Sequence, residues 1–200
     1  MTAPIDFYFD FSSPYGYFGS CRIDALAAKY DREVVWRPIL LGAVFKLTGG
    51  QPLPTIPLKS DYARRDILRC ARYYGIPFRI PSRFPVATQA PARAIYWVWD
   101  QDPPRAKALA AALLRAYFVE DRDISSPEVT AETAATVGIE REALLAALQE
   151  PAVKERLRTE TDAAIARGAF GSPFFIVDDE PFWGADRMDQ LEHWLKTGGW

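Results

Sequence analysis

Strand-forming sequence occurs only near the two ends of this 200-residue chain. Residues 5–10 alternate polar and aromatic side chains, and residues 33–37 form a second short run that stops at Pro38. Between them, residues 14–29 carry apolar side chains at a roughly helical spacing. Two strands joined through a helix form a right-handed crossover with parallel strands. The chain therefore opens with a predicted β-α-β unit.

The middle of the chain is predicted to be helical. From residue 40 to about residue 168 no convincing strand occurs, and the glycine- and proline-rich residues 49–57 indicate a loop. Helical patterns follow at residues 59–74, 89–99, 104–118, 127–136, 140–148 and 151–167.

Strand character returns at residues 172–178 and 181–183, and a final helix is predicted at residues 185–195. The two end segments have to share one sheet. We therefore expect an α/β fold in which residues 1–40 and 169–200 form one domain, and residues 41–168 form an all-helical domain inserted into it.

Composition excludes several classes of protein. The net charge is −2 and basic residues are scattered among acidic ones, so we expect no nucleic-acid partner. No apolar run approaches the roughly 20 residues of a membrane span. The N-terminus lacks the basic and apolar regions of a signal peptide, so we expect a cytoplasmic protein.

The thiols and the imidazole give no metal-binding pattern. Cys21 and Cys70 are far apart and lie outside any CxxC spacing, which favours two quiet thiols in a reducing compartment over a disulfide. His193 is the only histidine and is expected at the surface. We therefore expect no bound metal ion.

The start of the first predicted helix is the first candidate site. Ser12 or Ser13 precedes Pro14, which suits the first helical position. In thioredoxin-like proteins this turn holds Cys-x-x-Cys, whose thiolate the helix end stabilises. Here Ser13 and Gly16 stand at the cysteine positions, which excludes dithiol exchange at this turn. Either Ser13 only caps the helix, or its hydroxyl donates a hydrogen bond to the thiolate of a ligand.

Ser172 and Pro173 form the second candidate site, at the start of an apolar strand. In the thioredoxin-like arrangement a cis proline lies opposite the helix start and exposes the main chain of the preceding residue to a peptide-like ligand. That residue here is Ser172, with its N–H and C=O groups. The alternative is an ordinary trans proline at the first position of a strand.

Asp186, at the start of the last predicted helix, is the third candidate. Its carboxylate either caps that helix or receives the ammonium of a γ-glutamyl group, while neighbouring N–H groups bind the carboxylate of the same group.

Five motifs together resemble the 2-hydroxychromene-2-carboxylate isomerase family, which is close to kappa-class glutathione transferases and DsbA-like oxidoreductases. They cover essentially the whole chain, in order: residues 9–15, Leu58-Lys59 with Tyr62 and Asp66, residues 74–77, residues 171–173 and residues 183–187.

The resemblance implies a thioredoxin-like domain with a helical insertion, glutathione as cofactor, and a homodimer. It implies that Ser13 contacts the glutathione sulfur and that Ser172, beside Pro173, pairs with the cysteinyl unit. Ala185 and Asp186 match the γ-glutamyl subsite. Lys59 matches a lysine near the glutathione site, although a lysine at a helix start is otherwise more often solvated.

Two positions depart from the family pattern. Gly50 and Ala87 stand where many relatives have asparagine, toward the expected cleft. With these replacements we still expect the protein to bind glutathione. They leave undecided whether its substrate is a chromene.

These observations predict a glutathione-dependent isomerase of aromatic catabolism, acting on a 2-hydroxychromene-2-carboxylate-like substrate by addition of the thiolate, bond rotation and elimination. The alternatives are a kappa-class-like transferase that conjugates glutathione to electrophiles, and a glutathione-binding protein without turnover. A DsbA-type oxidase is the least expected, because the turn at Ser13 and Gly16 lacks both thiols.

Overall fold

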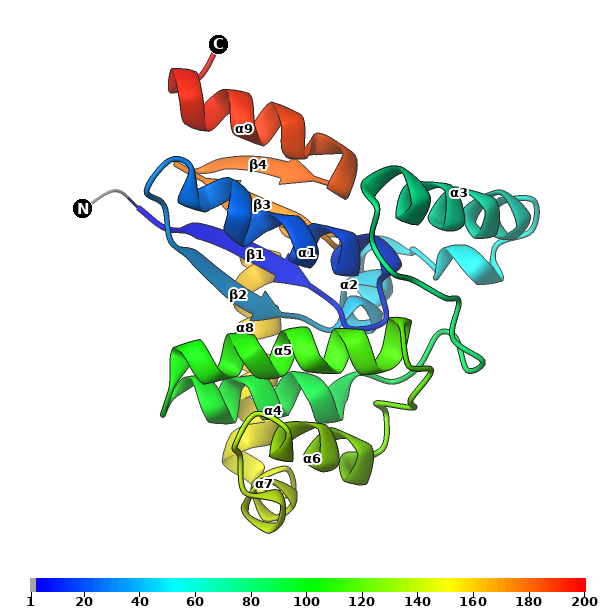
Figure 1. Cartoon of the computed structure of the whole chain (residues 1–200), viewed down its shortest axis with the longest axis vertical. Coiled ribbons are helices and arrows are strands. Elements are labelled where there is room, and N and C mark those ends of the chain that lie inside the picture. The colour runs from blue at the N-terminus through cyan, green and yellow to red at the C-terminus, as the bar shows by residue number, and fades with distance from the viewer. Residues whose placement is uncertain (1–2) are drawn as a thin grey trace.

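The computed structural model describes residues 3–200 and contains a four-stranded sheet with the order β2-β1-β3-β4. Strand β1 (Ile5–Phe9) pairs in parallel with β2 (Val34–Pro38) and antiparallel with β3 (Phe174–Val177). Strand β4 (Glu180–Trp183) forms a hairpin with β3 at the edge. The two ends of the chain therefore share one sheet, as Figure 1 shows in blue and orange, and this prediction is confirmed.

The predicted helices are present within about two residues of their expected bounds, the last one as a short 3-10 turn followed by a helix. They are α1 (Pro14–Ala28), α3 (Lys59–Tyr74), α4 (Gln89–Trp99), α5 (Pro103–Phe118), α6 (Pro127–Ala135), α7 (Arg141–Ala147), α8 (Pro151–Ala166), η2 (Ala185–Arg187) and α9 (Met188–Thr197).

Helix α2 (Leu41–Thr48) was not predicted, and a 3-10 turn η1 (Leu53–Thr55) lies in the predicted loop. The residue before α2, Leu40, provides no side-chain cap. Its place is taken by Asp10, whose Oδ2 accepts the Leu41 N–H at 2.9 Å. The start signal of α2 therefore lies outside its local sequence.

Helices cover both faces of the sheet. Figure 1 shows α1 in front of the strands and α8 behind them. On the α8 face, Ala164 packs in one buried cluster with Tyr8, Phe174 and Ile176. On the α1 face, Phe18 belongs to a larger core. This core also includes residues of β1, of β2 and of the helices between residues 41 and 168, called the helical block below. The division into a thioredoxin-like domain and an inserted domain stays a prediction.

Several predictions concern features of single side chains. Cys21 and Cys70 are both free thiols, and His193 is exposed as expected.

Over residues 3–200, no helix is long and apolar enough to cross a membrane. In the same range no group of three or more acidic, histidine or cysteine side chains is arranged to hold a metal ion.

Candidate functional site

The first turn of α1 lies beside the segment that leads into β3. The antiparallel pairing of β1 and β3 sets Tyr8 opposite Phe174, so the end of β1 and the start of β3 meet at one edge of the sheet. Ser13 is the N-cap of α1, and its Oγ accepts the Gly16 N–H at 3.0 Å. Capping by Ser13, one of the two serines considered, is confirmed.

Ser13 also contacts Ser172 directly. Its Oγ donates to the Ser172 carbonyl oxygen at 2.9 Å, and both residues are buried. The Ser172–Pro173 peptide bond is cis, so the cis alternative is confirmed. Sequence analysis expected both main-chain groups of Ser172 to be open to a ligand. In the structure the Ser172 carbonyl accepts the Ser13 hydroxyl, and its second lone pair can still accept a ligand N–H.

Two main-chain donors beside these serines remain open. Within the described part of the chain, neither the Tyr15 N–H, at the second position of α1, nor the Ser172 N–H has an acceptor. Helix N-terminal N–H groups and the positive end of the helix dipole bind anions. This edge of the sheet is therefore suited to an anionic, peptide-like ligand.

The close approach of α1 to Ser172 depends on a glycine. A Cβ added at Gly16 would lie 2.5 Å from Ser172 Oγ and 3.2 Å from Ser13 Cβ. A side chain at position 16 would therefore require Ser172 Oγ to move. The glycine at the second cysteine position of the thioredoxin-like motif has a steric role here.

Asp10 was not among the predicted site residues, and it connects the site to the segments of Leu41 and Thr88. Its carboxylate accepts hydrogen bonds from the Ser12 N–H (2.8 Å), the Leu41 N–H (2.9 Å) and the Thr88 hydroxyl (3.3 Å). Its own N–H donates to Ser172 Oγ at 2.9 Å. Burial raises the pKa of Asp10, and these donors only partly offset it. The available signal was an acidic residue directly between the aromatic strand and the serines.

Helix α3 is joined to α1 through Tyr15, whose hydroxyl donates to Asp66 Oδ2 at 2.6 Å. Burial alone would raise the pKa of Asp66, but hydrogen bonds from Tyr15 and Arg69 lower it overall. Lys59, the first residue of α3, is exposed and contacts no charged partner among residues 3–200. The structure thus places Lys59 in solvent, on a helix that borders the site.

Ala185 and Asp186 lie on the turn η2, which follows Gly184. Ala185 is buried, and its carbonyl accepts a hydrogen bond from Arg22 of α1 at 3.0 Å. Asp186 is exposed and pairs with Arg187 at 2.7 Å. Neither η2 nor α9 has a side-chain cap, so the alternative that Asp186 caps the last helix is wrong. Its carboxylate faces solvent beside the site.

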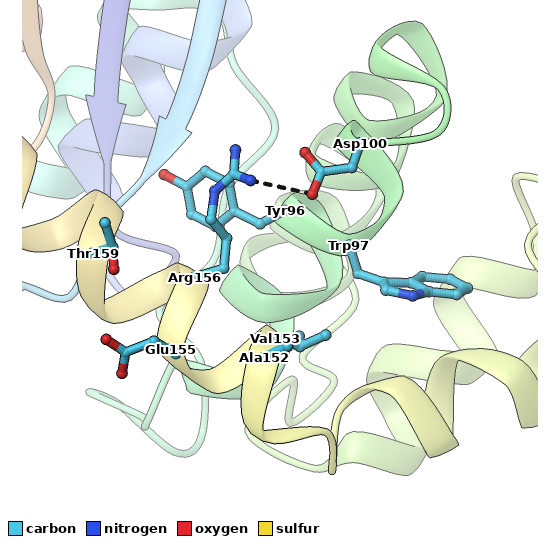
Figure 2. A pocket seen from close by; sticks show the side chains of 8 residues that line it. All are labelled: Tyr96, Trp97, Asp100, Ala152, Val153, Glu155, Arg156 and Thr159. Carbon is cyan, nitrogen blue, oxygen red and sulfur yellow. Dashed lines mark hydrogen bonds and ion pairs between the residues drawn. The ribbon is translucent and has the colours of Figure 1, made fainter.

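Figure 2 shows a groove between α4 and α8. Arg156 and Asp100, which line it, pair with each other at 3.2 Å. Another groove runs along α3 and the residues after it, from Leu68 to Phe78. Neither groove is lined by Ser13, Ser172 or Asp186. The candidate site is thus defined by its unpaired main-chain donors, the N–H groups of Tyr15 and Ser172.

Residues 4–196 match the family of DsbA-like thioredoxin domains. The chain belongs to this family. It is 33% identical over 199 residues to the 2-hydroxychromene-2-carboxylate isomerase of Sphingobium xenophagum, covering 98% of this chain and 99% of that protein. It is 28% identical to glutathione S-transferase kappa 2 of Caenorhabditis elegans, covering 96% and 91%.

A solved structure of a 2-hydroxychromene-2-carboxylate isomerase superposes with a TM-score of 0.87 at 30% identity, covering 96% of this chain and 94% of that one. The DsbA-like thioredoxin fold and the resemblance to the isomerase family are therefore confirmed. Within the DsbA-like family, the chain groups with enzymes named as isomerases and as glutathione transferases.

Proposed function

We propose that this protein is a glutathione-dependent isomerase acting on a 2-hydroxychromene-2-carboxylate-like aromatic substrate. The observation that carries the proposal is the Ser13 hydroxyl at the N-terminus of α1, bonded to Ser172 beside a cis proline, where redox relatives have a cysteine. Full-length similarity to named isomerases supports the reaction class.

The residues present fit glutathione. The open N–H groups of Tyr15 and Ser172 suit a thiolate and a peptide unit, and the exposed Asp186 carboxylate suits an ammonium. We assign Ser172 and Pro173 to the cysteinyl unit, Ala185 and Asp186 to the γ-glutamyl unit, and Lys59 to the border of the same site. The similarity to kappa-class glutathione transferases supports this ligand.

When bound, glutathione would supply a thiolate for addition to an activated double bond of the substrate, and rotation about the resulting single bond before elimination of the thiolate would change the substrate geometry. The protein contributes the electrostatics. The N-terminus of α1 and the Tyr15 N–H stabilise negative charge on sulfur, which lowers the thiol pKa from its ordinary value of about 8.5. The Ser13 hydroxyl lies at the same point and would add a donor once its hydrogen turns from the Ser172 carbonyl to the sulfur.

Replacing Ser13 tests the catalytic assignment. We expect Ser13→Ala to lower kcat at least about tenfold, because a hydrogen bond to a charged group is lost. Loss of the N-cap should also cost about 1 kcal/mol of stability. Turnover of 2-hydroxychromene-2-carboxylate is followed by absorbance with and without glutathione.

Ser12→Ala is the matched control, since Ser12 Oγ accepts the Val86 N–H and lies outside the proposed thiol site. This variant should retain wild-type kcat. Isomerisation that proceeds equally well without glutathione would contradict the proposal, as would a melting temperature that millimolar glutathione leaves unchanged.

A kappa-class-like transferase is the second candidate, because the similarity to glutathione S-transferase kappa 2 also spans nearly the full length. A stable glutathione conjugate formed with a model electrophile would favour it. Binding of glutathione without turnover on either substrate would favour a binding protein. We further propose a cytoplasmic homodimer, which sedimentation of the purified protein and fractionation of cells would test.

A further inference from the structure

The Ser13 hydroxyl is fully engaged in hydrogen bonds within the protein. Its oxygen accepts the Gly16 N–H at 3.0 Å, and its single hydrogen is donated to the Ser172 carbonyl at 2.9 Å. A hydroxyl has only one hydrogen to donate. In this arrangement Ser13 therefore has no donor left for a thiolate.

The acceptor side of this hydrogen bond is held in place. Ser172 Oγ accepts the Asp10 N–H at 2.9 Å, and the carbonyl of the next residue, Pro173, accepts the Gly184 N–H at 3.0 Å. Ser13 can redirect its hydrogen more easily, because rotation about the Cβ–Oγ bond leaves the oxygen near Gly16. Any exchange of partners would thus occur at the hydroxyl hydrogen.

Such an exchange has a cost at Ser172. Ser13 and Ser172 are 8% and 9% exposed, and the Ser13 hydroxyl is the donor that satisfies this carbonyl. Leaving a buried carbonyl without a donor destabilises the protein. The cost is about as large as the stabilisation from a hydrogen bond to a charged group. Redirecting the Ser13 hydrogen to a thiolate becomes favourable only when another donor reaches the Ser172 oxygen.

We propose, resting on the glutathione function above, that Ser13 and Ser172 together select the thiol: Ser13 activates a sulfur only when the same ligand brings an amide N–H to the Ser172 carbonyl. A cysteinyl peptide has that N–H next to the carbon that carries CH₂–SH. Simple alkyl thiols lack it. The site therefore discriminates cysteinyl peptides from other thiols by activation as well as by binding.

The test compares glutathione with an analogue methylated at the cysteinyl nitrogen, which lacks only the N–H. The pKa of each bound thiol is measured from thiolate absorbance during a pH titration, in wild type and in Ser13→Ala. We expect Ser13→Ala to raise the pKa of bound glutathione by about one unit and to leave that of the analogue unchanged. Ser12→Ala, the neighbouring serine, should change neither.

Equal shifts for both thiols, or no shift for either, would overturn the selection mechanism. If the analogue does not saturate the protein, kcat/KM with a model electrophile replaces the titration. Ser13→Ala should then lower kcat/KM about tenfold with glutathione and leave it unchanged with the analogue. Calorimetry separates the two proposals: no glutathione binding ends the proposed function, whereas binding with equal effects on both thiols ends only the selection.

Discussion

At the scale of single residues, two buried carboxylates near the ends of β1 show how the same side chain serves different purposes. Asp6 pairs with Arg37 at 2.6 Å and with Arg167. Asp10 has no basic partner in the described structure and accepts only from neutral N–H and O–H donors. Asp6 therefore joins charged groups, whereas Asp10 fixes main-chain segments around the serines.

The raised pKa of Asp10 predicts a pH dependence of stability. The native state binds the Asp10 proton more tightly than the unfolded chain does, so ionisation of Asp10 costs native stability. Its contribution is fully present below the ordinary carboxyl pKa of 3.8 and is lost as pH rises through the native pKa. Relative to Asp10→Asn, wild type should thus lose free energy of unfolding as pH rises.

Chemical denaturation of both proteins at a series of pH values from 3 to 7 measures this difference. Thr88→Val is the control, because it removes the hydroxyl bonded to Asp10 but leaves the carboxyl. It should retain the wild-type direction of the pH dependence. Parallel curves for wild type and Asp10→Asn would refute the prediction.

At the scale of elements, the geometry of the site depends on how closely α1 approaches Ser172 and Pro173, which lead into β3. Gly16 faces Ser172, and a Cβ at Gly19 would lie 3.0 Å from Pro173 Cβ. Both glycines belong to the buried face of α1. The helix therefore gives up intrinsic helix propensity at two positions, and in return its first turn lies in hydrogen-bond contact with Ser172.

A matched pair of glycine substitutions separates propensity from packing. Gly16→Ala should destabilise the protein by about 1–3 kcal/mol, because its Cβ meets Ser172 Oγ at 2.5 Å. It should also weaken glutathione binding. Gly42→Ala in α2, where nothing lies within 4 Å, should stabilise by up to about 1 kcal/mol. Denaturant titrations compare them, and a stabilised Gly16→Ala would show that Ser172 moves aside without cost.

At the scale of the whole molecule, charged groups tie the helical block to the sheet. Asp6 of β1 pairs with Arg37 of β2 and with Arg167, directly after α8. Arg167 also donates to the Tyr8 hydroxyl at 2.9 Å. Together with the shared hydrophobic core, these contacts hold the end of the helical block against the strands.

Removing the Asp6 charge should therefore weaken the molecule as a unit. We expect Asp6→Asn to lower the free energy of unfolding by about 2 kcal/mol, less than for a fully buried pair because both arginines are partly exposed. Asp162→Asn, in an exposed pair with Arg158, should change it by less than about 0.5 kcal/mol. Equal effects of the two substitutions would contradict this role of Asp6.

The sequence by itself determined most elements of this protein, because strand alternation, helical spacing and the Ser13-Pro14 start signal all lie within a few neighbouring residues. It also singled out Ser13 and Ser172 as candidate site residues, which the structure brings into contact. Only the tertiary structure decided that Ser13 donates to Ser172, 159 residues away, and that Asp10 starts α2 from 31 residues away. Such contacts depend on how elements pack, and local patterns carry no record of which distant group will satisfy a buried donor or acceptor.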